Sequence, residues 1–426
     1  MTSQQHKNYT LPLAMMFLLF FIISFVTGLQ NPLGVIVKEQ FSLTNFQSQL
    51  GNFANFLAYL IMGIPAGKMI ERIGYKKTAL VALVMGFTGV LIMFAGGHLK
   101  MFYLYLSGAF VSGFTMCTLN AVVNPMITVL GDEKGANQRL NFGGALNSVG
   151  ATIVPILGGY MMGTAAQKSI SDANPLLFLA MGIFALVFIV LYFVQIPEPH
   201  IVKKEEKVKN KHSALSFRHF VLGIVTIFIY VGIEVGVPNI ANLFMTEIPD
   251  NGGLGMDPTI AGTIVGTYWF LMLIGRLVGG ALGKMFSSKQ MLTFVSSTGL
   301  VLTLAAIYAP IDITVHMPVV TSQLAFEFAE VPINVMFLIL IGLCTSIMWP
   351  GIFNLATMGI GKYMAQGSGI FMTMVVGGGI LPLVQGGIAD IAGYLNSYWL
   401  IVASLAFMLY YALIGSKNIN TDIPVD

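Results

Sequence analysis

One carboxylate lies in the middle of a long apolar segment. Glu234 stands within the run 219–246, and no other acidic residue falls so clearly at the centre of such a run. A charged carboxylate inside a membrane costs several kcal/mol, so it is rare without a role. A proton, Na⁺ or a basic partner must neutralise it, and Arg276 is a candidate partner that lies toward the cytoplasmic end of its own segment. We expect Glu234 to be a cation-coupling residue, with a structural hydrogen bond as the alternative.

Uncharged polar side chains form a second group in the apolar segments. Asn120 and Asn124 are four residues apart, so they share one face of a helix. Carboxamides both donate and accept hydrogen bonds, which suits a ligand rich in hydroxyl groups. An amide in a membrane helix also commonly joins two helices, and that interpretation stays open for each residue. The candidate substrate-binding residues are Gln30, Asn31, Asn55, Asn120, Asn124, Asn147, Tyr230, Asn239 and Trp349.

Prolines interrupt three of the segments that carry these side chains. Pro32 follows Asn31, Pro238 precedes Asn239, and Pro350 follows Trp349. Proline removes a helical hydrogen bond, and broken membrane helices offer free backbone groups to a ligand. An indole such as that of Trp349 can pack on a sugar ring while its N–H bonds a hydroxyl. The alternative is that these breaks only kink helices for packing.

The elements that must position these residues are membrane helices. The chain is 56% hydrophobic and 9% charged, whereas soluble domains carry about 25% charged residues. A span needs about 20 apolar residues. The pattern predicts an all-α membrane protein with twelve transmembrane helices, at 11–37, 46–68, 78–97, 101–130, 139–163, 174–196, 219–246, 258–284, 289–309, 331–360, 364–390 and 394–415.

The basic residues predict the orientation of the chain. With the N-terminus inside, all Lys and Arg except Lys38, Lys100 and Lys168 fall on the cytoplasmic side. We therefore expect a multi-pass protein of a bacterial-type inner membrane with both termini cytoplasmic, bound to the lipid bilayer and not to nucleic acid. The segment 311–330 is an external loop that we expect to be partly helical.

A duplication divides the chain into two six-helix halves. Gly67-Lys68-Met69 recurs as Gly283-Lys284-Met285, 216 residues later, and Gly150 and Pro155 match Gly377 and Pro382 at an offset of 227. Such repetition is typical of transporters. The predicted parts are an N-terminal half (1–197), a lysine-rich cytoplasmic linker (198–218) and a C-terminal half (219–426).

The sequence offers no chemistry typical of an enzyme. Cys117 and Cys344 lie in apolar runs, and their spacing fits neither a disulfide framework nor a zinc site. No nucleophile, paired acids or metal cluster is visible, so we predict no enzymatic activity and no cofactor.

A glycine-rich stretch with basic residues resembles the cytoplasmic loop motif of the major facilitator superfamily. The stretch runs from Gly63 to Lys77, and Lys68 stands where the family has an acid. Gly275 to Lys289 is similar to a second copy. The resemblance implies the major facilitator fold, with two pseudo-symmetric halves, and conformational roles for Gly63, Gly67, Glu71, Arg72, Gly74, Lys76, Lys77, Arg276 and Gly283.

Four further stretches resemble the fucose permease and glucose/galactose transporter branch of that superfamily. They are 41–47, 124–131 with 139–141, 346–353 and 377–382. Asn31 and Asn120 stand where the fucose permease has carboxylates, and the stretch from Tyr230 to Gly236 resembles the glucose/galactose transporters. The resemblance implies a monomeric secondary transporter that imports a monosaccharide with H⁺ or Na⁺ by alternating access. A superfamily exporter or facilitator of a non-sugar compound is the alternative.

Overall fold

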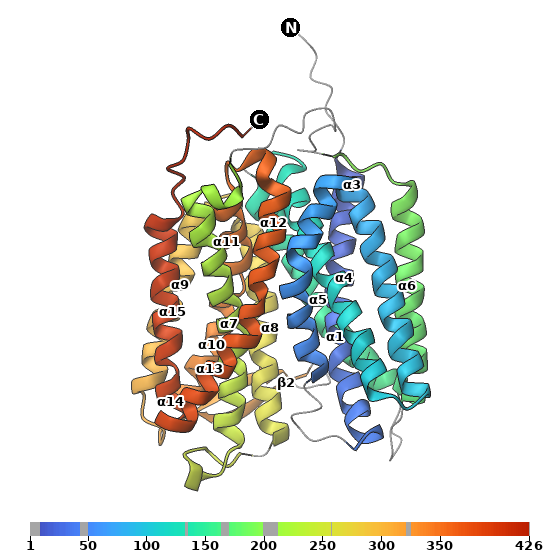
Figure 1. The fold of residues 1–426 in the computed structure, drawn as a ribbon. Helices are drawn as coiled ribbons and strands as arrows, with labels where there is room; N and C mark the ends of the chain where they lie inside the picture. Colours follow the sequence, from blue (N-terminus) through green and yellow to red (C-terminus); the bar gives the residue numbers. More distant parts are fainter. Residues whose placement is uncertain are drawn as a thin grey trace. The chain divides into compact units, whose positions relative to one another are not determined.

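The structure is a computed structural model that describes residues 9–42, 50–132, 135–162, 170–198, 212–256, 258–320 and 325–425. The contacts divide the chain into two compact units. Unit 1 contains Met1–Asn210 and Gly361–Thr373, and unit 2 contains Lys211–Ile360 and Met374–Asp426. Figure 1 shows both as bundles of long helices.

Unit 1 is built from long apolar helices. Helix α3 holds two of the predicted spans, which meet at a sharp turn at Gly74, where the backbone leaves the helical region (φ 87°, ψ 169°). A positive φ of this size favours glycine. The helices are α1 (Thr10–Gln40), α3 (Leu50–His98), α4 (Phe102–Val129), α5 (Ala136–Met162), α6 (Asn174–Phe193) and α12 (Met364–Thr373).

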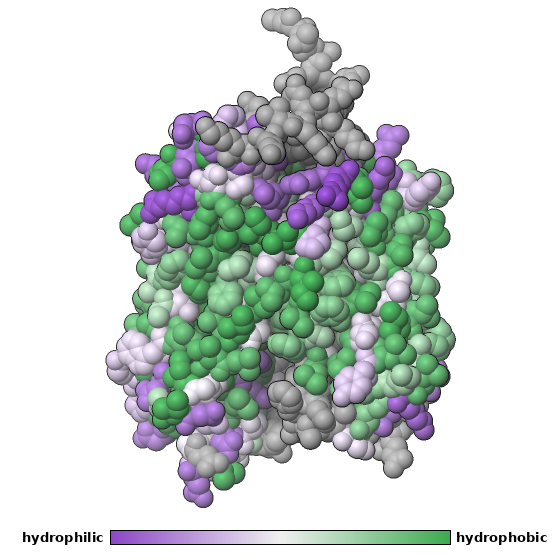
Figure 2. Space-filling view, viewed as in Figure 1, coloured by the Kyte–Doolittle hydropathy of each residue, from purple (hydrophilic) through white to green (hydrophobic). Residues whose placement is uncertain are grey.

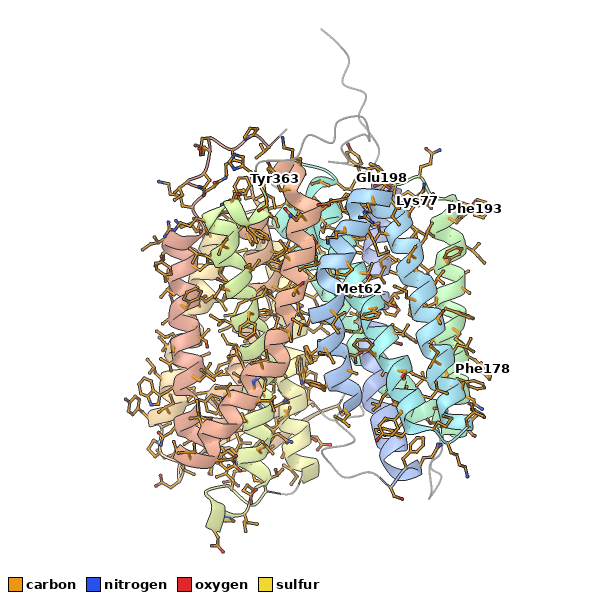
Figure 3. All side chains as sticks on the ribbon, in the orientation of Figure 1. Met62, Lys77, Phe178, Phe193, Glu198 and Tyr363 are labelled. Atoms are coloured by element: carbon orange, nitrogen blue, oxygen red, sulfur yellow. The ribbon has the colours of Figure 1, made fainter. Side chains whose placement is uncertain are left out.

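The turn at Gly74 is held by the segment that follows the sixth predicted span. The Glu198 carboxylate accepts hydrogen bonds from the backbone N–H groups of Tyr75 (2.7 Å) and Lys76 (3.0 Å), and Lys76 Nζ donates to the Tyr192 carbonyl at 2.7 Å. Figure 3 shows Glu198 beside Lys77 at this end of the unit. The carboxylate therefore caps the helix that restarts after Gly74.

Helix α12 packs against α3 and α4 within unit 1. A Cβ atom on Gly369 would lie 2.6 Å from the Gly63 carbonyl oxygen and 2.9 Å from the Gly67 Cα atom. Glycines therefore allow the two helices to cross at close backbone distance. The Ser368 hydroxyl donates to the Ala121 carbonyl of α4 at 2.8 Å.

Unit 2 is also mainly helical. Two of its predicted spans are broken, one between α10 and α11 and one between α12 of unit 1 and α13. The helices are α7 (Arg218–Thr246), α8 (Pro258–Leu282), α9 (Ser288–Tyr308), α10 (Ile333–Thr345), α11 (Met348–Thr357), α13 (Gly377–Ala392), α14 (Tyr394–Ser397) and α15 (Trp399–Tyr410), the last followed by a π-helical turn (Tyr411–Gly415).

The segment expected to be a partly helical loop is a β-hairpin. Strand β1 (Thr314–Val320) pairs antiparallel with β2 (Phe326–Pro332), with Met317 opposite Ala329. Val315, Met317 and Val319 alternate with residues of the other face, and Met317 and Val319 are buried. The helical expectation was wrong because this period of two is that of a strand.

The surface has the character of a membrane protein. Within the described residues, nine helices are long and apolar enough to cross a membrane, and Thr10–Val26 is a shorter apolar helix. Figure 2 shows hydrophobic side chains along the helices and hydrophilic ones toward their ends. The predicted class, a mainly helical membrane protein, is confirmed at this level, and the count of twelve spans stays a prediction.

Candidate functional site

The mid-helix carboxylate of unit 2 forms a partly buried ion pair. Arg276 Nη2 of α8 donates to Glu234 Oε1 of α7 at 3.2 Å, and the two side chains are 11% and 16% exposed. From the sequence, Arg276 was expected near the cytoplasmic end of its span, away from the mid-span Glu234. The structure brings the two together, because α7 packs on α8 and the arginine side chain is long.

Arg276 also contacts the break between α10 and α11. Its Nε donates to the Ser346 carbonyl at 3.3 Å. In a continuous helix that carbonyl would accept from the N–H of residue 350, but Pro350 has none. By the same rule Pro238 leaves the Glu234 carbonyl without its helical donor.

Aromatic side chains surround the charged pair. The Tyr230 phenol, one helical turn before Glu234, is buried, and its hydroxyl has no hydrogen-bond partner among the described residues. Its ring meets the partly buried Trp349 indole edge to face, with 6.3 Å between the ring centroids. The Tyr268 hydroxyl shares a 3.0 Å hydrogen bond with Thr345 Oγ1. We call Glu234, Arg276, Tyr230, Ser346 and Trp349 the charged cluster.

Asn239 lies apart from the charged cluster. It is five residues beyond Glu234 on α7 and is exposed. Five residues correspond to about 140° around a helix axis, so the two side chains leave α7 in different directions. The structure therefore does not join this predicted residue to the ion pair.

Unit 1 contains a neutral hydrogen-bonded group on α3 and α4. Asn120 Nδ2 donates to the Tyr59 hydroxyl at 2.9 Å and to the Met116 carbonyl at 3.0 Å. Asn124 Nδ2 donates to the Asn120 carbonyl (2.8 Å) and to its side-chain oxygen (3.3 Å). The predicted shared face of Asn120 and Asn124 is confirmed. Tyr59 was missed, because nothing in its own segment distinguishes it from other aromatic residues.

Unused hydrogen-bonding atoms lie on the same two helices. Asn55 is 4% exposed and Thr118 is fully buried, yet Asn55 Oδ1 and Thr118 Oγ1 have no hydrogen-bond partner among the described residues. Unpaired buried polar atoms cost free energy. We call Asn55, Tyr59, Thr118, Asn120 and Asn124 the amide cluster.

The other predicted substrate residues of unit 1 have different positions. Asn147 Nδ2 of α5 donates to the Phe20 carbonyl of α1 at 3.2 Å, a contact that joins two helices. The side chains of Gln30 and Asn31 on α1 lie outside the described residues.

The residues of the loop motif divide into four groups. Gly63 and Gly67 line the crossing with α12, and Gly74 forms the turn described above. Arg276 lies in the charged cluster and not in a loop. The remaining members stand at helix ends, with Glu71, Arg72 and Lys77 exposed, Lys76 bonded to Tyr192, and Gly283 buried.

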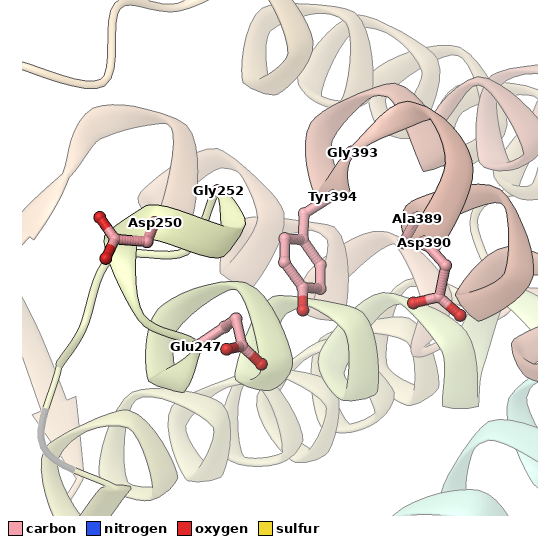
Figure 4. Close-up of a pocket in the computed structure, with 7 residues that line it drawn as sticks. All are labelled: Glu247, Asp250, Gly252, Ala389, Asp390, Gly393 and Tyr394. Carbon is pink, nitrogen blue, oxygen red and sulfur yellow. The ribbon is translucent and has the colours of Figure 1, made fainter.

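A separate acidic cavity of about 550 Å³ lies at the far end of α7. Figure 4 shows Glu247, Asp250, Asp390 and Tyr394 around it. It contains none of the residues predicted to bind substrate. Within the described part of the chain, no group of three or more His, Cys, Asp or Glu could hold a metal ion.

Comparisons with known proteins place the chain among transporters. A family profile described as Major Facilitator Superfamily matches residues 16–381. A protein of Brucella abortus named glucose/galactose transporter is 33% identical over 98% of this chain and 97% of its own length. The L-fucose-proton symporter of Escherichia coli is 24% identical over 94% of this chain and 91% of its own.

The fold is also found among solved structures. The crystal structure of the transporter FucP in its outward conformation has a TM-score of 0.83 and 23% sequence identity, covering 96% of this chain and all of that one. At this identity the likeness establishes the fold alone.

Proposed function

Because this chain belongs to the Major Facilitator Superfamily, we propose that it imports a neutral monosaccharide of the glucose/galactose or fucose class together with a cation. Membership makes the chain a membrane transporter and not an enzyme. The names of the similar proteins, a glucose/galactose transporter and a fucose-proton symporter, support a sugar substrate. We place glucose and galactose first, since the relative named for them is the more similar one.

We also propose a finer architecture, which the same membership supports. The chain forms twelve spans in two six-helix halves, 1–197 and 219–426, joined by a cytoplasmic linker at 198–218. Both termini lie in the cytoplasm, and the protein works as a monomer in an inner membrane. The asymmetry of basic residues supports this orientation.

One observation carries the coupling proposal, the partly buried ion pair of Glu234 and Arg276. A carboxylate paired with a guanidinium is neutral as a unit, and binding of a cation to the carboxylate leaves the pair with a net positive charge. Each change of charge alters the cost of burying the cluster in a closed, dry intermediate. Cation binding at Glu234 would therefore control which conformational steps the transporter makes.

The proton fits the charged cluster better than Na⁺. Arg276 already supplies a positive charge to the carboxylate at 3.2 Å, and a second fixed cation beside it would be repelled. A proton needs only one carboxylate oxygen. We propose that H⁺ is the coupled ion.

The amide cluster supports recognition of the sugar. Its carboxamides and hydroxyls are uncharged and both donate and accept, as sugar hydroxyls require. Asn55 Oδ1 and Thr118 Oγ1 lie in this cluster without a hydrogen-bond partner among the described residues.

Uptake by reconstituted vesicles tests the function. Purified protein in liposomes is given labelled glucose, galactose and fucose under an imposed H⁺ gradient or, separately, an imposed Na⁺ gradient. We expect accumulation of a hexose with the H⁺ gradient. The exporter alternative replaces this proposal if no sugar accumulates or competes while cationic amphiphiles are transported.

A further inference from the structure

Arg276 touches two helices at the points where prolines interrupt their hydrogen bonding. On α7 it pairs with Glu234, whose carbonyl lacks a donor because of Pro238. At the α10–α11 break it bonds the Ser346 carbonyl, which lacks a donor because of Pro350. One guanidinium thus connects the carboxylate to the backbone three residues before Trp349.

We propose that Arg276 is a positioning residue that transmits cation binding at Glu234 to the α10–α11 break and so to Trp349. This inference rests on the proposed function, since it assumes that Glu234 binds the coupled cation and that Trp349 faces the sugar.

Protonation of Glu234 should shift the Arg276 guanidinium, because it removes the charge of its hydrogen-bond acceptor. Arginine remains protonated at all relevant pH values, so it must keep hydrogen-bond acceptors in the buried cluster. With Glu234 protonated, the strongest acceptor is lost, and the guanidinium shifts toward the Ser346 carbonyl, which already accepts from its Nε. A stronger bond to Ser346 moves the α10–α11 break.

The break is suited to such a movement. Ser346 and Ile347 form a turn between the two helices, and Ile347 has φ −106° and ψ 3°, outside the helical region. Trp349 stands two residues beyond it and contacts Tyr230, which lies one helical turn before Glu234 on α7. The titratable groups facing Glu234 are Tyr230 from α7 and Arg276 and Tyr268 from α8.

Arginine and lysine would differ at this position. A guanidinium presents several N–H groups in a fixed plane, so it can hold Glu234 and Ser346 together. A lysine ammonium keeps the charge but as a single point. Arg276→Lys therefore keeps the counter-ion of Glu234 but removes the bridge, which is the link that the guanidinium makes between Glu234 and Ser346.

The experiment uses Trp349 as the reporter. Trp269→Phe and Trp399→Phe remove the other two tryptophans of the chain. Sugar titrations of the purified full-length protein at pH 5.5 and pH 8, roughly, give two dissociation constants, whose ratio measures coupling between cation and sugar. Trp349 emission is also recorded across this pH range without sugar.

We expect the parent to show a ratio of about tenfold or more, and a change of Trp349 emission with pH alone. Arg276→Lys should bring the ratio close to one and abolish the emission change without sugar, while sugar still binds. Arg218→Lys is the matched control, because Arg218 lies at the start of α7 and bonds the exposed Tyr410 hydroxyl. It should behave as the parent.

Pro350→Ala tests the bridge without removing any charge. Alanine restores the N–H that Ser346 lacks, so the carbonyl gains a helical donor and no longer needs Arg276. The ratio should again fall close to one. Pro350→Ala also tests the link between Arg276 and Ser346 if Arg276→Lys fails to fold, as judged by gel filtration and thermal unfolding.

The outcomes separate the two proposals. A parent that shows no sugar response at either pH overturns the proposed function. A parent with normal coupling, and an Arg276→Lys or Pro350→Ala variant that keeps the full ratio, overturns the bridge alone. Arg276 would then be only a counter-ion of Glu234.

Discussion

The helices that carry the amide cluster and the charged cluster contain the same defect, a proline that frees a backbone carbonyl, and each satisfies that carbonyl in a different way. In unit 1, Pro125 leaves the Ala121 carbonyl without its helical donor, and the neutral hydroxyl of Ser368 bonds it at 2.8 Å. In unit 2, Pro350 leaves the Ser346 carbonyl without its helical donor, and the charged guanidinium of Arg276 donates a hydrogen bond to it at 3.3 Å.

This difference separates recognition from coupling. A hydroxyl on a free carbonyl completes a packing contact that does not change with pH. A guanidinium shared between a carbonyl and a carboxylate changes its bonding whenever the carboxylate is neutralised. The amide cluster should therefore set sugar affinity, and the charged cluster should set its dependence on the cation.

The largest effect is expected at Glu234. Gln keeps the shape of the side chain but cannot bind a proton, so Glu234→Gln should lose all uphill accumulation while sugar exchange between preloaded compartments survives. Since Gln leaves the Arg276 charge unpaired, the variant is compared with Glu234→Gln/Arg276→Gln, which removes both charges. Glu247→Gln, at the end of the same helix, is the control. Concentrative uptake at the parental level by Glu234→Gln would make this carboxylate structural.

Asn120→Asp should make the sugar affinity of the amide cluster depend on pH. The carboxylate cannot donate to Tyr59 or Met116 and is buried without a counter-ion. Sugar binding at pH 7 should weaken by about 3 kcal/mol or more, and recover as the pH falls because the protonated acid can donate again. Calorimetric titrations at several pH values measure this. Affinity that does not vary with pH would contradict it.

Asn120→Ala should change affinity alone. Loss of a buried hydrogen-bonding partner costs about 1–3 kcal/mol, and the dependence of transport on the driving ion should stay as in the parent. Asn147→Ala is the matched control, since Asn147 joins α5 to α1 and should affect stability and not sugar binding. Unchanged affinity in Asn120→Ala would return this residue to a packing role.

The smallest effect is expected at Tyr59. Its hydroxyl accepts one hydrogen bond from Asn120, so Tyr59→Phe should weaken sugar binding by about 0.5–1.5 kcal/mol. Equilibrium titrations beside Asn120→Ala measure the difference. A loss as large as that of Asn120→Ala would mean that Tyr59 itself binds the sugar.

Much of the helical fold could be predicted because lipid imposes a simple rule on sequence. Apolar runs of about 20 residues mark helices, and the predicted bounds of 219–246 lie within one residue of α7, Arg218–Thr246. The β-hairpin was missed although Val315, Met317 and Val319 alternate along β1 with the period of two that indicates a strand.

The sequence by itself determined local relations, and the tertiary structure decided the long-range ones. Helical geometry ties a residue to those three or four positions away, so the Asn120–Asn124 face and the carbonyls freed by Pro238 and Pro350 can be derived from the sequence. The partners Arg276 for Glu234 and Asn120 for Tyr59 are 42 and 61 residues apart. Such pairs depend on the rotation and depth at which helices pack, which many contacts across the unit fix together and no single segment encodes.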